Sequence, residues 1–328
     1  MLKYIARRVI LMIPTLLAIS IISFMIIQLP PGDFLSYYME SLRQQGERVD
    51  PAEIEALRAR YGVDEPVFTQ YVKWMSGVIV GDFGRSLQWQ QPVNQIIRRR
   101  LPASIGVSLA SLFFVYLLAI PIGTFSATNQ YSFGDYIATA IGFVGLAIPN
   151  FFLALILLYA YYNATGQVAI GFYSQEFQHA SFSLAKLWDL LKHLWIPTVV
   201  IGTAGTCGLI RVMRANLLDE LKKPYVIVAR AKGVPRRKLL YKYPFRIAVN
   251  PIISTLGWLL PTLVSGELLV SLVLSIPTLA PVFLNAIISQ DMLLAASSVM
   301  ILSSLTVIGT LLSDILLAWV DPRIREAV

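Results

Sequence analysis

The sequence has 328 residues, of which 56% are hydrophobic and 14% charged, with a formal net charge of +8 and a mean hydropathy of +0.65. This composition is far more apolar than that of soluble proteins, so it excludes a pair of soluble domains and predicts an integral membrane protein. The positive charge gathers in one loop, which argues against nucleic-acid binding. Cys207 is the single cysteine and excludes an intrachain disulfide, and two isolated histidines, His179 and His193, do not suggest a metal site.

Six apolar stretches are long enough to cross a bilayer, and each is expected to be helical because irregular backbone cannot face lipid. They are residues 9–29, 104–127, 136–161, 195–213, 247–276 and 293–320. The first follows three basic residues and leads into "QLPPGD" rather than a small-residue cleavage site, so we expect a retained signal anchor. Prolines at 149, 197, 251 and 261 interrupt several of these stretches. The prediction is an all-α integral membrane protein with six transmembrane helices.

The long connection after the first stretch, residues 30–103, is predicted to be a helical cap. Asp50 is a candidate N-cap followed by Pro51 at the first helical position, and a second helix is expected from Pro66 to about Val80. "GDFGRS" is typical of a turn, and "PVNQIIRRRLPAS" is typical of an amphipathic helix at the membrane surface that leads into the second span.

The distribution of lysine and arginine predicts the orientation in the membrane. Residues 214–246 carry ten basic residues against Asp219 and Glu220, whereas the bases of residues 30–103 are offset by acids. Cytoplasmic loops carry the basic excess, so both termini and the basic loop are expected in the cytoplasm and residues 30–103 outside. The three arginines at 98–100 run against this rule.

Residues 225–246, "YVIVARAKGVPRRKLLYKYPFR", are named the elbow here. Gly233 is expected to end a helix and Pro235 to begin another, and the small residues Ala229 and Ala231 leave a flat surface for a close protein contact. The helix before Gly233 is expected to be continuous with the preceding segment, because its apolar residues follow helical spacing. These are Leu217, Leu218, Leu221, Tyr225, Val228 and Ala229. Membrane orientation alone also explains the positive charge of the elbow. A protein contact and a purely topological role therefore both stay open for this loop.

The elbow resembles the cytoplasmic coupling loop of binding-protein-dependent ABC importer permeases, and within them the B-type subunit of the dipeptide/oligopeptide class. The resemblance covers nearly the whole chain, through "MLKYIARRVILMIPTLLAISIISFMI", "RYGVDEPVFTQYVKWM", "GDFGRSL" and "SDILLAWVDPRIR". It implies a type I ABC importer permease architecture. Its parts are an anchor helix at 1–29, an extracytoplasmic loop at 30–103, a five-helix core at 104–320 with the coupling loop at 214–246, and a cytoplasmic tail at 321–328.

In that family the loop forms a short coupling helix that docks in a cleft of a cytoplasmic ATPase subunit. The resemblance therefore implies a set of contact residues, which are Tyr225, Ala229, Arg230, Ala231, Lys232 and Gly233. It also implies a bacterial or archaeal cytoplasmic membrane, a second homologous permease subunit, two ATPase subunits, an extracytoplasmic binding protein and surrounding lipid as partners, and no nucleic acid.

The chain departs from the family in its fifth predicted span. Members commonly have a glutamate followed by a "GLPGIG"-like turn, whereas this chain has Ser271 and "SIPTLAP", with its own glutamate at Glu267. Glu267, Ser271 and Asn150 are candidate residues of the translocation pathway, and a structural carboxylate is the alternative for Glu267. Because of this departure, peptides and oligosaccharides both stay open as substrates.

The energy source is expected to lie outside this chain. "GQVAIGFY", residues 166–173, has P-loop glycine spacing but lacks the lysine and the Ser/Thr that hold phosphate and magnesium. ATP and magnesium are therefore expected on partner subunits, with no cofactor in this chain and no enzyme activity of its own.

Two other functional classes fit the sequence less well than the importer. An ion-coupled transporter would need several ionisable groups at mid-membrane, but only Glu267 and Asp314 lie in predicted spans, and Asp314 is expected to pair with an arginine or cap backbone groups. An intramembrane enzyme would need a histidine or similar group in a span, and none is predicted there. The small residues of "IGTAGTCG", 201–208, fit either a seam with a second subunit or internal packing.

Overall fold

The computed structural model describes residues 2–28, 65–86 and 88–320, and these residues are helical apart from short turns and loops. A single antiparallel bridge joins Arg85 to Pro92. The chain divides into two compact units, and each is described by itself. Unit 1 comprises Met1–Val9, Ile105–Pro277 and Ile308–Val328, and unit 2 comprises Ile10–Ser104 and Thr278–Val307.

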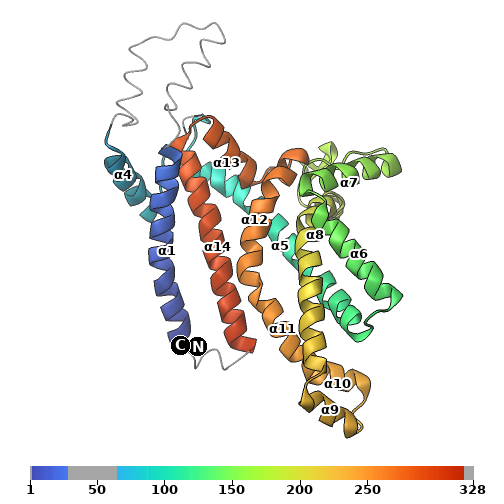
Figure 1. The fold of residues 1–328 in the computed structure, drawn as a ribbon. Coiled ribbons are helices and arrows are strands. Elements are labelled where there is room, and N and C mark those ends of the chain that lie inside the picture. The colour runs from blue at the N-terminus through green and yellow to red at the C-terminus, as the bar shows by residue number, and fades with distance from the viewer. Residues whose placement is uncertain (1, 29–64, 87, 321–328) are drawn as a thin grey trace, which may run out of the picture. The chain divides into compact units, whose positions relative to one another are not determined.

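Figure 1 labels the helices in chain order. They are α1 (Leu2–Gln28), α4 (Val67–Ile79), α5 (Val93–Thr128), α6 (Phe133–Ala147), α7 (Asn150–Thr165), α8 (Leu184–Leu221), α9 (Pro224–Ala231), α10 (Arg236–Lys242), α11 (Pro244–Ser254), α12 (Leu256–Val273), α13 (Leu279–Ile288) and α14 (Met292–Val320), with a 3-10 turn at Gln175–Phe177.

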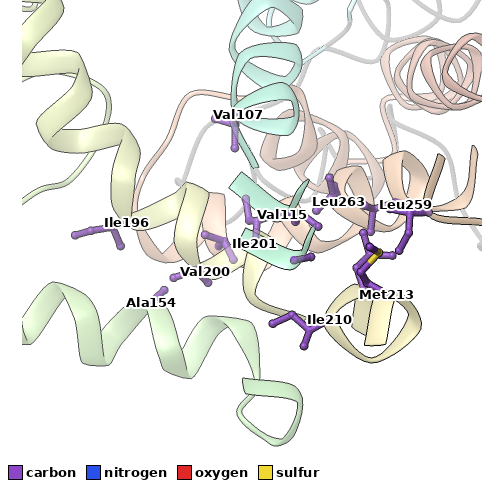
Figure 2. Close-up of a cluster of buried hydrophobic side chains, with 14 of the residues drawn as sticks. Val107, Val115, Ala154, Ile196, Val200, Ile201, Ile210, Met213, Leu259 and Leu263 are labelled. Atoms are coloured by element: carbon purple, nitrogen blue, oxygen red, sulfur yellow. The ribbon is translucent and has the colours of Figure 1, made fainter. Parts of the chain in front are cut away.

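Helix α8 is the centre of unit 1 and packs against α6, α7, α11 and α12. Its buried side chains include Val200, Ile201 and Met213, and Figure 2 shows them gathered with Val115 of α5 and Leu259 of α12. Side chains in such a cluster gain dispersion contacts on all sides. In lipid the hydrophobic effect no longer drives helices together, so these dispersion contacts are a main source of attraction between them.

Small residues allow α5 and α8 to approach closely. A Cβ placed on Gly202 would lie 2.7 Å from Phe114, and one on Gly123 would lie 2.6 Å from Met213. Gly205 also faces α5, since a Cβ there would lie 3.3 Å from Val115. The 201–208 stretch therefore serves internal packing at Gly202 and Gly205, in the manner of small-residue helix interfaces.

Cys207, from the same stretch, is buried. Its Sγ would lie 2.8 Å from a Cβ on Gly145, so this thiol packs between α8 and α6.

Four helices of the described chain are long and apolar enough to cross a membrane, or five if the α6–α7 pair counts as one span. They are the helices that contain Lys3–Met25, Val93–Thr128, Leu184–Leu221 and Met292–Trp319. The predicted all-α membrane fold is confirmed, whereas the count of six spans stays a prediction.

Two of the predicted spans are not single helices. The stretch 136–161 is divided between α6 and α7, which meet at an angle of 109° across Ile148 and Pro149. The stretch 247–276 is divided between α11 and α12 at Thr255. A proline lacks the backbone N–H that would continue a helix, so the first break has a local cause in Pro149.

Helix α8 begins at Leu184, eleven residues before the predicted span at 195. His193 therefore lies in α8, two residues before the predicted span, and its Nδ1 lies 2.8 Å from the carbonyl oxygen of Asp189 one turn earlier. Helix α6 likewise begins at Phe133, whereas the predicted span begins at residue 136. Asp135 therefore lies inside the helix, although the prediction left it in the preceding loop.

In unit 2, the predicted helix at 66–80 is confirmed as α4. Trp74 of α4 stacks on Phe24 of α1 with ring centroids 5.5 Å apart, and its Nε1 donates a hydrogen bond to Ser297 Oγ of α14 at 3.3 Å. The hydroxyls of Tyr71 and Ser20 are 2.8 Å apart. The helix predicted from Asp50 lies outside the described residues.

The predicted amphipathic helix before the second span is present as the first turns of α5, without a break before the span. Val93, Ile96 and Ile97 are buried while Arg98 and Arg99 are exposed, which is the predicted amphipathic pattern.

The predicted turn at "GDFGRS" is confirmed, with positive φ angles at Gly81 and Gly84. The sequence reading did not single out its anchor, Asp291, which is fully buried just before α14. The Asp291 carboxylate accepts hydrogen bonds from Ser86 Oγ and from the backbone N–H of Gln88 (3.1 Å) and Leu294 (3.3 Å).

Candidate functional site

The elbow follows directly from the end of α8 in unit 1 (Figure 1). Helix α8 stops at Leu221, and α9 starts at Pro224, where a proline is favourable because the first helical N–H has no intrahelical partner. The side chain of Val226 is fully buried, and α9 contacts both α8 and α10. Within unit 1, α9 therefore packs on its neighbours with an apolar residue inward.

The helix predicted to run from 217 to Gly233 is interrupted. Residues 222 and 223 separate α8 from α9, so the helical spacing inferred across them is wrong. Val228 was placed on the apolar face but is 52% exposed, as is its neighbour Ile227 at 58%. The break rotates α9 relative to α8, and α9 therefore buries Val226 and presents Ile227 and Val228 outward.

Gly233 ends α9 as predicted. Its φ is 76°, and two hydrogen bonds close the turn, from Gly233 N–H to Arg230 O (3.0 Å) and from Val234 N–H to Ala229 O (3.3 Å). This is a Schellman motif, which needs a left-handed residue at this position. A Cβ on Gly233 would meet nothing within 4 Å, so the requirement for glycine comes from backbone conformation rather than from space.

The proposed contact residues lie around this turn. Tyr225, Arg230, Ala231, Lys232 and Gly233 are exposed, and Ala229 is half-buried. Together with Ile227, Val228 and Tyr241 of α10, which is 54% exposed, they give the elbow an apolar and basic surface.

Two polar contacts fasten the elbow at its edges. The Tyr225 hydroxyl donates a hydrogen bond to the Glu220 carboxylate of α8. Burial and this hydrogen bond raise the pKa of Tyr225, so its hydroxyl stays neutral. On the other edge, Arg236 Nη2 donates to the carbonyl oxygen of Thr128 at the end of α5, at 3.3 Å. The elbow therefore contacts the ends of both α8 and α5.

An ion pair that the sequence reading missed lies at the same end of the unit. Arg214 of α8 donates two hydrogen bonds to the Asp135 carboxylate of α6, from Nε to Oδ1 at 3.0 Å and from Nη2 to Oδ2 at 2.8 Å. Asp135 is buried and also accepts from Ser126 Oγ and from the Tyr131 N–H at 2.9 Å. The sequence places Arg214 only in the basic loop, because 79 residues separate it from its partner.

The candidate pathway residues lie on α12 and α7. Glu267 and Ser271 are one turn apart and both are 1% exposed, on the buried face that also carries Leu263 and Leu274. Asn150 begins α7, and its Nδ2 would lie 3.5 Å from a Cβ on Gly266. The structure thus brings Asn150 to the segment of α12 that holds Glu267.

The turn after α12 explains how the chain accommodates "SIP" in place of a glycine-containing turn. Ser275 adopts a φ of 51°, and the hydrogen bonds from Ser275 N–H to Leu272 O (3.3 Å) and from Ile276 N–H to Ser271 O (2.8 Å) form a second Schellman motif. The Gly171 N–H also donates to Leu274 O at 2.8 Å, which ties the loop after α7 to the end of α12.

Asp314 has the partner that was expected of it. Its Oδ2 lies 3.2 Å from Nη1 of Arg8, so the start of α1 and the last part of α14 are joined within unit 1.

Comparison with protein families gives two matches that together span almost the whole chain. The family described as "Binding-protein-dependent transport system inner membrane component" matches residues 119–326. Its N-terminal companion, "Binding-prot-dependent transport system membrane comp, N-term", matches residues 1–110.

Relatives are similar over their full length. The chain is 35% identical over 326 residues to the oligopeptide transport system permease protein AppB of Bacillus subtilis, which covers 99% of this chain and 100% of that protein. It is 28% identical to the dipeptide transport system permease protein DppB of Alkalihalophilus pseudofirmus (99% and 100% covered) and 28% identical to OppB of Haemophilus influenzae (99% and 100% covered).

Proposed function

The chain belongs to the family of binding-protein-dependent transport system inner membrane components, and on that premise we propose that it is one of two permease subunits that form the pathway of an ATP-driven importer. It is a multi-pass membrane protein, with both termini and the elbow in the cytoplasm. A binding protein delivers the solute to the outer face, and two ATPase subunits drive alternating access through the elbow.

The observation that carries this proposal is the exposed surface of the elbow. Ile227, Val228 and Tyr241 are more than half exposed on a short helical segment that the Schellman turn at Gly233 makes rigid. Exposed apolar side chains on a basic loop are costly in water and are typical of a protein contact. An ATPase cleft that covers them explains both their exposure and the rigid turn.

The proposed solutes are di- and oligopeptides. The relatives named above are oligopeptide and dipeptide permeases, which favours peptides over the oligosaccharide alternative. Glu267, Ser271 and Asn150 are the proposed pathway residues, supported by their position on the buried face of α12 and at the adjoining start of α7.

The chain itself is proposed to bind no nucleotide, and ATP and magnesium are assigned to the ATPase subunits. In the 166–173 segment, Gly166 ends α7 with a φ of 70°, and a loop with a 3-10 turn follows rather than an α-helix. A P-loop needs a helix N-terminus at this point to bind phosphate, which supports the proposal.

An ion-coupled transporter is the competing class. Of the carboxylates in apolar helices, Asp135 is bound by Arg214 and Asp314 lies beside Arg8. Paired carboxylates at helix ends support a structural role rather than a chain of proton or sodium sites.

The test is whether the shape of the elbow matters when its charge is kept. Ala229→Trp retains every lysine and arginine but pushes a docked surface away, and Gly233→Ala adds about 1–2 kcal/mol of left-handed strain without filling occupied space. We expect both variants to insert normally and to lose most substrate-stimulated ATP hydrolysis in the reconstituted complex.

Two controls complete this experiment. Gly233→Asn keeps a residue that tolerates the left-handed conformation, and Arg237→Gln combined with Lys238→Gln removes charge from exposed positions without changing the turn. Both are expected to retain most of the stimulation. Full stimulation in Ala229→Trp, measured beside recovery of the ATPase subunits in a pull-down, would leave only the orientation role for this loop.

A further inference from the structure

A cavity of about 420 Å³ lies behind the elbow, within unit 1. Its apolar walls include Leu221 at the end of α8, Val234 after the glycine turn, and Leu239 and Leu240 of α10. Arg230 and Arg236 are also among the lining residues. The volume is in the range of small-molecule sites, which hold a compact group but not a whole phospholipid.

The charge in this cavity is positive and is not balanced by its lining. The lining residues include two arginines and no carboxylate. Two acids on the adjoining helices are already bound, Asp135 by Arg214 and Glu220 by the Tyr225 hydroxyl. Arg236 donates to the Thr128 carbonyl through Nη2, which leaves most of the five N–H donors of its guanidinium available.

The position of the cavity identifies the kind of anion. Its lining includes Thr128 and Leu221, the last residues of α5 and α8, which are two of the helices apolar enough to span a membrane. Thr128 directly follows the apolar run that ends at residue 127, which places this wall of the cavity at the depth of lipid head groups, whereas Leu221 lies eight residues beyond the run that ends at 213. Basic pockets between transmembrane helices at this depth suit anionic head groups, and the apolar walls suit the glycerol and the start of an acyl chain.

We propose that this cavity binds the phosphate-bearing head group of an anionic phospholipid, with Arg230 and Arg236 donating to the phosphate. The bound lipid then fills the space behind the elbow and braces it against the ends of α5 and α8. ATPase docking concerns the exposed surface formed by Ile227, Val228 and Tyr241. Arg230 belongs to the proposed contact residues and also lines the cavity, so lipid binding has to be measured without the ATPase subunits. The inference depends on the depth of the cavity in the membrane and not on the transported solute.

The test uses the purified full-length permease without its partner subunits, so that failure of ATPase coupling does not affect the result. Native mass spectrometry would count bound dihexanoyl-phosphatidylglycerol as its concentration is raised, with dihexanoyl-phosphatidylcholine as the zwitterionic comparison. We expect one saturable phosphatidylglycerol site and at least ~10-fold weaker binding of phosphatidylcholine, because two charge-assisted hydrogen bonds act on a net negative head group.

Matched variants locate the site. Arg230→Gln with Arg236→Gln should weaken phosphatidylglycerol binding at least ~10-fold, whereas Arg237→Gln with Lys238→Gln removes the same charge from exposed residues outside the cavity lining and should weaken it less than ~3-fold. Val234→Trp keeps both arginines but fills the cavity, and should also remove binding.

Three results would overturn the proposal. If both double variants weakened phosphatidylglycerol binding equally, the binding would come from general electrostatic attraction by the basic loop and not from the cavity. Saturable binding that persists in Val234→Trp would place the lipid elsewhere. Displacement of the lipid by glycerol 3-phosphate at equal concentration would identify a site for free phosphate esters instead of a lipid.

Discussion

At the scale of single residues, backbone conformation and charge pairing decide the properties of the candidate site. Gly233 is needed because its φ is positive, although a side chain would have room. Asp135 and Arg214 differ from Gly233, because burial rather than backbone conformation makes each of the two side chains depend on the other. A buried carboxylate without its partner is far more costly than a neutral pair.

The Asp135–Arg214 pair gives a stability prediction. Arg214→Gln leaves Asp135 buried without its bidentate partner and should lower the stability of the purified permease by about 2–3 kcal/mol, at the low end for buried pairs because Arg214 is 28% exposed. Asp135→Asn with Arg214→Gln should cost less than the sum of the single changes. Thermal unfolding in detergent checks this, and additive losses would show that the two side chains do not interact.

Glu267 gives a prediction about transport. Because the residue is 1% exposed on the buried face of α12, Glu267→Gln keeps the shape and removes the charge. We expect lower peptide uptake in proteoliposomes with the complex still assembled. Normal uptake in Glu267→Gln, accompanied by loss of assembly in Glu267→Leu, would instead identify a structural carboxylate.

At the scale of elements, helix ends determine where the chain turns toward its functional parts. The two Schellman motifs, after α9 and after α12, have the same hydrogen bonds but different residues at the left-handed position, Gly233 and Ser275. A residue with a Cβ pays a steric cost there that glycine does not. The turn after α12 is therefore formed at a cost, while the turn after α9 is not.

Ser275→Gly should stabilise the protein. The side chain of Ser275 is exposed, so little contact is lost, and relief of the left-handed strain outweighs the extra chain entropy of glycine in the unfolded state. We expect a gain of about 0.5–1 kcal/mol in thermal unfolding. Ser275→Ala is the control and should show no gain, because alanine keeps the Cβ; an equal gain in both would remove backbone strain as the cause.

At the scale of the whole molecule, the chain is a membrane component whose basic loop and termini are predicted to share one side. Arg8 of α1 forms an ion pair with Asp314 of α14, so the start of the first helix lies beside the last part of the final one. This agrees with the prediction that both termini lie on the same side of the membrane. The excess of lysine and arginine in the elbow predicts that this side is the cytoplasmic one.

Single cysteines in a Cys207→Ser background test the orientation. Ser181→Cys lies in the loop between α7 and α8 and is expected outside, whereas Arg237→Cys lies in α10 and is expected in the cytoplasm; both positions are exposed. In intact cells an impermeant thiol reagent should label the first and reach the second only after lysis. The reverse pattern would invert the topology.

The sequence by itself determined the features that depend on a few neighbouring residues. Hydropathy was sufficient for the all-α membrane fold, and the order of "ARAKGVP" was sufficient for a helix that ends at Gly233. Helix ends and apolar runs are local, so their signals survive without knowledge of the fold.

Tertiary structure alone decided which faces meet. It divides residues 136–161 by a 109° bend, turns Val226 rather than Val228 inward, packs Gly202 on α5, and pairs Asp135 with Arg214 across 79 residues. Within the membrane spans the lipid-facing and core-facing sides are both apolar, so periodicity does not distinguish them as it does in water. The contacts are set by how small and large side chains fit between helices, which no local pattern records.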